Sequence, residues 1–398
     1  MKKIMTLAAV AALVLCSCAK IDDVKTVVED EPVAFGVYAG NAAVKATYGD
    51  ITTDSLKASA DGFGVFAYYT LHNAWSASDK PNFMYNQQVT YNESANTTLY
   101  PAKWEYSPLK YWPNGQNETE VESGTINDKV SFFAYAPRIA VTASTGVPTT
   151  YVPTSGQGIT ALSDNDAAGA PTVTFTVPSK PEEQIDLLWA TPVKDQTKQS
   201  ITGTIAFTFN HALAKLNVKV QAVVDAVNPT TANLDSNTKI VLESLELKAA
   251  GTKTGTLSLN DGSWSSKSGE TDVTYNSSSF SSTTTVHGKT GFNVTETATA
   301  LNTTTSPMII PGSVASGSFV IIANYWVITE DTALKEGYSA VQNKIRKTST
   351  AAITFAGGTA YEVLAKLGLT NTSFSVTEVG AWTVGSGQNV DLPVNTNS

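Results

Sequence analysis

The stretch Ala214-Lys215-Leu216-Asn217-Val218-Lys219-Val220 alternates strictly between apolar and polar side chains. A period of two places all the apolar side chains on one face of an extended chain, which is typical of a β-strand with one buried face. A helix would repeat its apolar residues every three or four positions instead. The stretch therefore predicts a half-buried strand.

Short apolar runs of this kind occur along the whole chain, separated by Gly, Pro, Asn and Asp, while stretches with a helical period are scarce. Asn260-Asp261-Gly262 follows the alternating Leu257-Ser258-Leu259 and indicates a hairpin, because Gly supplies the positive φ of the primed turns. Residues 261–305 are rich in Ser and Thr, and we expect long exposed loops there. The other candidate strands are 33–37, 64–68, 130–135, 173–177, 186–190, 205–209, 240–247, 256–259, 319–328, 353–355, 361–364 and 374–376. The chain is expected to be all-β.

A length of 398 residues allows two domains, each with its own core. Residues 191–200 are polar and poor in strand signals, so they predict the boundary between the domains. The expected division is a leader over 1–17, a flexible tether over 18–31, an N-terminal β-sandwich over 32–200 and a C-terminal β-sandwich over 201–398.

The N-terminus carries an export signal. Lys2 and Lys3 precede a short apolar run, which ends at Leu15-Cys16-Ser17-Cys18. The run is too short to span a bilayer, and small residues beside Cys18 favour lipoprotein processing. We therefore expect Cys18 to be the lipidated first residue of the mature protein, anchored by its acyl chains, palmitate among them. The alternative is an ordinary secretory leader that leaves Cys18 as a free thiol.

Composition argues against several classes of function. The net charge of −9 becomes −11 once Lys2 and Lys3 are removed, which disfavours nucleic acid as a partner. The three histidines, His72, His211 and His287, show no metal-ligand spacing, and His211 is interpreted as a structural imidazole. We expect no enzyme activity, no metal and no cofactor.

Aromatic residues are concentrated between residues 104 and 112. Trp104, Tyr106, Tyr111 and Trp112 fit a packed core, because each aromatic ring buries a large area. The alternative is a surface that stacks on sugars, which would make the protein a glycan-binding lipoprotein of the cell surface.

Several segments, taken together and in order, resemble the fimbrillin family, the lipoprotein-derived subunits of protease-assembled (type V) pili of Gram-negative bacteria. The segments are Gly62–Tyr68, Lys110-Tyr111-Trp112-Pro113, Phe132–Pro137, Asp186–Ala190, Phe209–Leu216 and Phe355–Tyr361. The resemblance implies two tandem transthyretin-like β-sandwich domains and an outer-membrane lipoprotein on the cell surface that joins a fimbrium. The implied partners are other fimbrial subunits, in a homopolymer and with anchor and tip proteins, a maturation protease, and the outer membrane through the lipid. Host or bacterial surface ligands are further candidate partners.

In the family, a trypsin-like or arginine-specific protease removes the first strand, and the C-terminal strand of a neighbouring subunit fills the vacated groove. The displaced strand would present Val33, Phe35 and Val37, which alternate with small residues. The cut would fall between Lys45 and Ala46, and a lysine at this place disfavours a protease that accepts only arginine.

The implied donor strand carries Val390, Leu392 and Val394 with the same period of two. Pro393 costs this strand one ladder hydrogen bond, which an edge strand tolerates better than a central one. The main hypothesis is therefore a structural fimbrial subunit matured near Lys45. Its alternatives are an anchor or accessory subunit that keeps its lipid and first strand, and the glycan-binding lipoprotein.

Overall fold

The computed structural model describes residues 31–37, 53–115, 123, 127–149, 158–201, 204–224, 234–302 and 306–382. Strands are the main secondary structure of these residues, and their short helical elements with defined bounds are α1 (Thr53–Ala58) and η1 (Pro181–Glu183). The all-β fold class expected from the sequence is confirmed. None of the described helices is long and apolar enough to cross a membrane.

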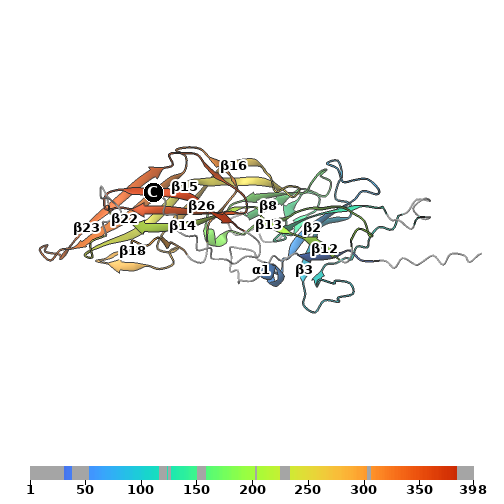
Figure 1. Ribbon diagram of the computed structural model, residues 1–398, viewed down its shortest axis with the longest axis horizontal. Helices are drawn as coiled ribbons and strands as arrows, with labels where there is room; N and C mark the ends of the chain where they lie inside the picture. Colours follow the sequence, from blue (N-terminus) through green and yellow to red (C-terminus); the bar gives the residue numbers. More distant parts are fainter. Residues whose placement is uncertain are drawn as a thin grey trace, which may run out of the picture. The chain divides into compact units, whose positions relative to one another are not determined.

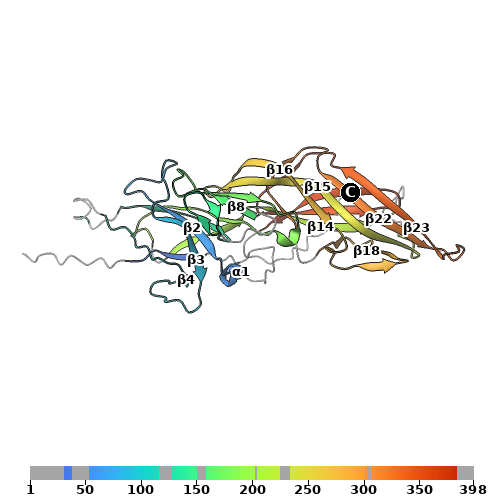
Figure 2. The ribbon, with the colours of Figure 1, turned by 180° about the vertical axis from the view of Figure 1, so that it is seen from behind.

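The first sheet has the strand order β12-β1-β4-β3-β2-β5-β10-β13, and β11 also pairs with β5. Figure 2 shows its strands β2, β3 and β4 next to one another. Only Thr208 separates β12 from β13, so the two ends of the sheet lie close together and the sheet folds over a core. Its strands are β1 (Ala34–Val37), β2 (Phe63–Tyr69), β3 (Met84–Tyr91), β4 (Trp104–Glu105), β5 (Val130–Ala136), β10 (Leu188–Ala190), β11 (Val193–Gln196), β12 (Thr204–Phe207) and β13 (Phe209–His211).

Strands β2 and β5 are buried on both faces. Phe63 and Val65 belong to the cluster enclosed by the first sheet, whereas Phe66 and Tyr68 point into a second cluster on the opposite face. This second cluster also contains Phe175 of β9. Burial on both faces explains why these strands have continuous apolar sequences rather than alternating ones.

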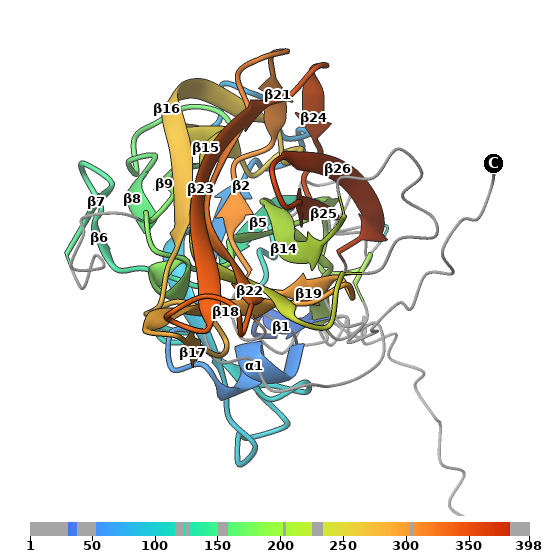
Figure 3. The same ribbon diagram turned by 90° about the vertical axis from the view of Figure 1, so that its left-hand side faces the viewer.

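A second sandwich is built from two layers, which Figure 3 shows side by side. The alternating stretch of the opening paragraph is β14, whose residues alternate between buried and half-buried positions as predicted. One layer, of order β19-β14-β25-β26 with β20 on β14, consists of β14 (Ala214–Ala222), β19 (Thr299–Ala300), β20 (Met308–Ile309), β25 (Thr359–Leu367) and β26 (Thr372–Ala381). The other consists of β8 (Gly158–Leu162), β9 (Thr172–Thr176), β15 (Thr238–Ser258), β16 (Trp264–Tyr275), β17 (Thr284–Val286), β18 (Lys289–Val294), β22 (Val320–Glu330) and β23 (Tyr338–Thr348).

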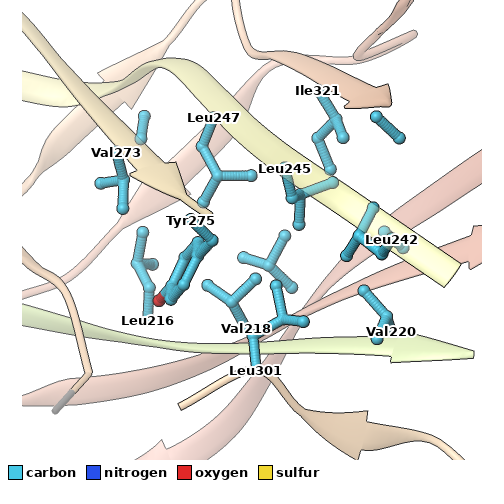
Figure 4. Packing of buried hydrophobic residues seen from close by; sticks show 14 of the residues in the cluster. Leu216, Val218, Val220, Leu242, Leu245, Leu247, Val273, Tyr275, Leu301 and Ile321 are labelled. Atoms are coloured by element: carbon cyan, nitrogen blue, oxygen red, sulfur yellow. The ribbon is translucent and has the colours of Figure 1, made fainter. Parts of the chain in front are cut away.

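The core between these two layers is made of aliphatic side chains and a few rings, among them Leu216, Leu245 and Tyr275 (Figure 4). Figure 1 shows strands β14, β15, β22 and β23, which enclose this core, close to one another. Two small ribbons complete the described strands: β6 (Val141–Thr142) with β7 (Val147–Pro148), and β21 (Gly312–Val314) with β24 (Ile353–Phe355).

The predicted hairpin at Asn260-Asp261-Gly262 is confirmed, because β15 and β16 pair across this turn and Gly262 has a φ of +71°. The expectation of long loops over 261–305 was wrong. β16 to β19 lie in this segment, and β16 extends along β15 as its antiparallel partner. Thr favours strands through its branched Cβ, and most polar side chains of β16 are exposed although the strand is paired.

The division into domains at residue 200 stays a proposal, and the strand pairing bears on where it should fall. β12 and β13 follow residue 200 but pair with β1 and β10 of the first sheet. β9 precedes residue 200 but pairs with β15. Strands on either side of residue 200 therefore pair with the sheet that lies mainly on the other side of it.

Candidate functional site: the cradle of the first strand

Strand β1 is an interior strand of the first sheet. It pairs in parallel with β12, from Ala34 opposite Thr204 to Val37 opposite Phe207. On its other side it pairs antiparallel with β4, at Phe35 opposite Trp104. We call β12, β4, residues 110–111 and the cluster beneath them the cradle of β1.

The three side chains predicted to face the core do so. Val33 and Phe35 are fully buried, and Val37 is partly buried against the same cluster. The Phe35 ring lies 5.3 Å from the ring of Tyr106 and 5.9 Å from those of Phe132 and Phe207, measured between ring centroids. Burial of such a side chain stabilises the fold by roughly 1.5–3 kcal/mol. Side chains therefore hold most of β1 in place.

Gly36 faces away from this core and lies close to two residues of the cradle. A Cβ placed on Gly36 would stand 3.2 Å from Thr204 Oγ1 and 3.5 Å from Ala102 Cβ. Contacts at these distances leave room for a small side chain after slight adjustment of Thr204. The outer face of β1 is thus covered, since Ala34 is also buried, and it admits only a small side chain at Gly36.

The hydroxyl of Tyr106 reaches the main chain of β1. It donates to Val33 O at 2.6 Å and accepts from the Lys110 N–H at 3.3 Å, while Val33 N donates directly to Lys110 O at 2.8 Å. Burial raises the pKa of this phenol, so the hydroxyl keeps its proton and remains a donor. The sequence suggested Tyr106 as a core residue, but it carried no signal for this contact.

The core interpretation of the aromatic segment is confirmed for three of its four members. Trp104 is 2% exposed, and Tyr106 and Trp112 are each 4% exposed, whereas Tyr111 is 46% exposed. The sugar-stacking alternative assigned Trp104 and Trp112 to a surface, and that assignment was wrong. Their rings fill the core of the cradle, because burying the large apolar area of an aromatic ring lowers the free energy of the folded state.

His211 is a structural residue, as expected. It is buried, and its Nδ1 lies 2.8 Å from Asp186 Oδ2. The ring of Trp382 stacks on it at 3.8 Å between centroids. The three residues thereby join β13 to the end of β26. Across the described ranges, no cluster of three or more His, Cys, Asp or Glu side chains is arranged to hold a metal ion.

The other predicted site residues lie outside the described residues: Cys18, Lys45, Ala46, Val390, Leu392 and Val394. Sequence reasoning missed β12 as the parallel neighbour of β1. The sequence predicts a strand over the apolar run 205–209, but it places that strand in the C-terminal domain. Parallel pairing across so many residues leaves no local signal in either strand.

Comparisons with known proteins agree with this architecture. The model of a family described as fimbrillin-like matches residues 46–382. The fimbrium subunit Fim1C of Phocaeicola vulgatus is 32% identical over 324 residues, which cover 74% of this chain and 75% of the relative. A solved structure of a fimbrial protein from Bacteroides vulgatus has a TM-score of 0.68 and 26% identity, covering 89% of this chain and 100% of that one. Both relatives are fimbrial proteins rather than enzymes. The chain belongs to the fimbrillin-like family.

Proposed function

We propose that this protein is a structural subunit of a cell-surface fimbria that polymerises by exchanging β1 for the C-terminal strand of a neighbouring subunit. The chain is exported as an outer-membrane lipoprotein modified on Cys18. A protease then cuts between Lys45 and Ala46, which separates β1 from the rest of the chain. The shaft grows as each vacated cradle receives the next strand.

The observation that carries this proposal is the position of β1. It is an interior strand with a buried aromatic side chain, yet it has only four residues and lies before the proposed cut. Its removal would leave β12 and β4 with unpaired main-chain groups beside an open apolar core. Such an edge is a template for a strand from another chain.

The proposed donor matches what β1 presents to the cradle. Val33, Phe35 and Val37 point into the core at every second residue, and Val390, Leu392 and Val394 repeat the same spacing. A strand in an extended conformation would place all three on one face. The donor is thus equipped to replace the apolar contacts of β1, although Leu392 is smaller than Phe35.

A disulfide between Gly36→Cys and Ala102→Cys tests the exchange directly. The distance of 3.5 Å between an ideal Cβ on Gly36 and Ala102 Cβ fits a disulfide. The oxidised double variant should be cut at Lys45 but should keep β1 in the cradle and form no fibres. Reduction should restore polymerisation, measured as ladders resistant to detergent and as fibres in the electron microscope.

The two single-cysteine variants are the matched controls and should polymerise like the wild type under both conditions. Fibre formation by fully oxidised double variant would contradict strand exchange. N-terminal sequencing of protein sheared from cells separates the related roles. A start at Ala46 supports a shaft subunit, whereas protein found only in the membrane with lipid on Cys18 supports an anchor that keeps β1.

A further inference from the structure

The antiparallel ladder beside β1 is interrupted at Val33. Phe35 lies opposite Trp104, and Pro32 lies opposite Tyr111. Pro32 and Phe35 are three residues apart, whereas their partners Trp104 and Tyr111 are seven residues apart. Four residues between Trp104 and Tyr111 therefore have no partner in this ladder. The register then makes Val33 and Lys110 direct partners.

A regular pair in this position would exchange two hydrogen bonds, one in each direction. One of them is present, from Val33 N to Lys110 O at 2.8 Å. The other is relayed by the hydroxyl of Tyr106, which accepts from Lys110 N at 3.3 Å and donates to Val33 O at 2.6 Å. The hydroxyl therefore replaces a missing main-chain contact in a buried place.

We propose that Tyr106 is a positioning residue that holds the main chain of whichever strand occupies the cradle, β1 before the exchange and the donor strand after it. Its hydroxyl binds a main-chain carbonyl, so its action does not depend on the side chains of the strand. A strand shifted by one residue would turn its apolar face outwards. A strand shifted by two would keep that face and would still offer a carbonyl to Tyr106. The pocket of Phe35 therefore decides the register, and Tyr106 adds to the strength of docking. This inference rests on the proposed function.

The geometry of β1 commits the incoming strand to one alignment, provided that it runs in the direction of β1. The carbonyl held by Tyr106 belongs to the residue two positions before the one in the Phe35 pocket. With Leu392 in that pocket, the carbonyl of Val390 lies on Tyr106. Pro393 then takes the place of Gly36, next to Ala102.

Cysteine trapping in assembled fibres measures this alignment. Ala102→Cys is combined in turn with Asp391→Cys, Pro393→Cys or Asn395→Cys in the full-length chain, and disulfide yields between subunits are compared. Each set is made with Tyr106 unchanged, with Tyr106→Phe and with Tyr68→Phe. Tyr68 is the matched control, because it is also buried and its hydroxyl donates to a main-chain carbonyl, Gly169 O, at 2.8 Å.

With Tyr106 unchanged, position 393 should dominate over 391 and 395. Tyr106→Phe should leave that preference unchanged but should raise the rate of subunit loss from heated fibres about tenfold, the effect expected when a hydrogen bond between buried groups is lost. Tyr68→Phe should leave both the preference and the rate of subunit loss unchanged, so a general loss of stability cannot imitate the result.

Equal rates of subunit loss from the Tyr106→Phe and Tyr68→Phe fibres would overturn the role of Tyr106. Dominance of position 391 or 395 with Tyr106 unchanged would overturn the alignment. Failure of the proposed function has a different signature, because the oxidised Gly36→Cys, Ala102→Cys subunit would then polymerise. If that disulfide blocks polymerisation and the two phenylalanine variants lose subunits at equal rates, only the inference about Tyr106 is rejected.

Discussion

Strands β1 and β22 are both interior strands with buried side chains, but they are held in different ways. β22 pairs with β23 over eleven successive residues, from Val320 opposite Thr348 to Glu330 opposite Tyr338, and with β15 on its other side. β1 pairs over four residues with β12 and at one residue with β4, and a tyrosine hydroxyl relays one of its contacts.

The two strands show two kinds of stabilisation: main-chain hydrogen bonds hold β22, whereas buried side chains hold β1. Many ladder bonds fix β22 in its sheet, so it can leave only when the second sandwich unfolds. β1 is held mainly by Val33, Phe35 and a few hydrogen bonds. We therefore expect that it can leave while the rest of the fold persists, as the proposed strand exchange requires.

The largest expected effect comes from truncating one anchor in each strand. Phe35→Ala should weaken the docking of β1 by about 3–5 kcal/mol, and Ile321→Ala in β22 should cost about 2–5 kcal/mol. Both side chains are fully buried in their clusters. In Phe35→Ala, the loss of protection from exchange should be confined to β1 and its neighbours. In Ile321→Ala, it should extend over the whole second sandwich. Hydrogen exchange followed residue by residue measures both.

The comparison fails if Phe35→Ala accelerates exchange throughout the second sandwich as strongly as Ile321→Ala does. It also fails if Ile321→Ala releases β22 alone. Phe374→Ala is a suitable control, because Phe374 packs at the margin of the second core and is only partly buried. It should cost less than either variant.

An intermediate effect is expected at the contact between the first sheet and the second sandwich. The turn between β15 and β16 approaches Trp189 of β10 so closely that a Cβ on Gly262 would stand 2.4 Å from the indole ring. Gly262→Ala should therefore destabilise the fold by about 1–3 kcal/mol through overpacking, in addition to backbone strain. Unfolding in urea, followed by tryptophan fluorescence, measures this loss.

Gly288→Ala is the control that measures the cost of the positive φ without overpacking. Gly288 has a φ of +74°, close to the +71° of Gly262, but its Cβ would meet nothing within 4 Å. We expect a cost of only about 1 kcal/mol there. Equal costs for the two variants would show that the contact with Trp189 does not couple the regions.

The smallest expected effect concerns the same turn. Ser263 Oγ donates to Asp261 Oδ1 at 2.7 Å, and this hydrogen bond lowers the pKa of the Asp261 carboxyl from its usual value of 3.8. Because the folded-state pKa is the lower one, the resulting stability is present above about pH 3.8 and is lost as the pH falls through the lowered pKa. Ser263→Ala should be slightly less stable than the wild type at pH 7.

The gap between wild type and Ser263→Ala should close in acid, when the carboxyl is protonated in both. Urea unfolding of the two proteins from pH 7 down to a pH below the lowered pKa measures it. A gap that stays constant over this range would assign the effect to the turn's conformation rather than to the carboxylate. Asp261 is largely exposed, so solvent screening keeps the effect small.

Local patterns in the sequence predicted a large part of the fold. The alternation along β14, the continuous apolar run of β5 and the Asn-Asp-Gly turn each reflect a constraint that acts within a few residues. The Ser- and Thr-rich segment misled because composition reports exposure, and a long strand such as β16 can be exposed and still be paired.

For the candidate site, too, the sequence predicted the local features but not the contacts between distant residues. The sequence marked Val33, Phe35 and Val37 as one face of a first strand, because their spacing is a local property. It could not show that β12 would be the parallel neighbour, nor that Tyr106 would bind Val33 O, since those contacts join residues far apart in the chain. Hydrophobic spacing therefore determined which residues of the first strand are buried, and only the tertiary structure decided which strands and which hydroxyl hold that strand in place.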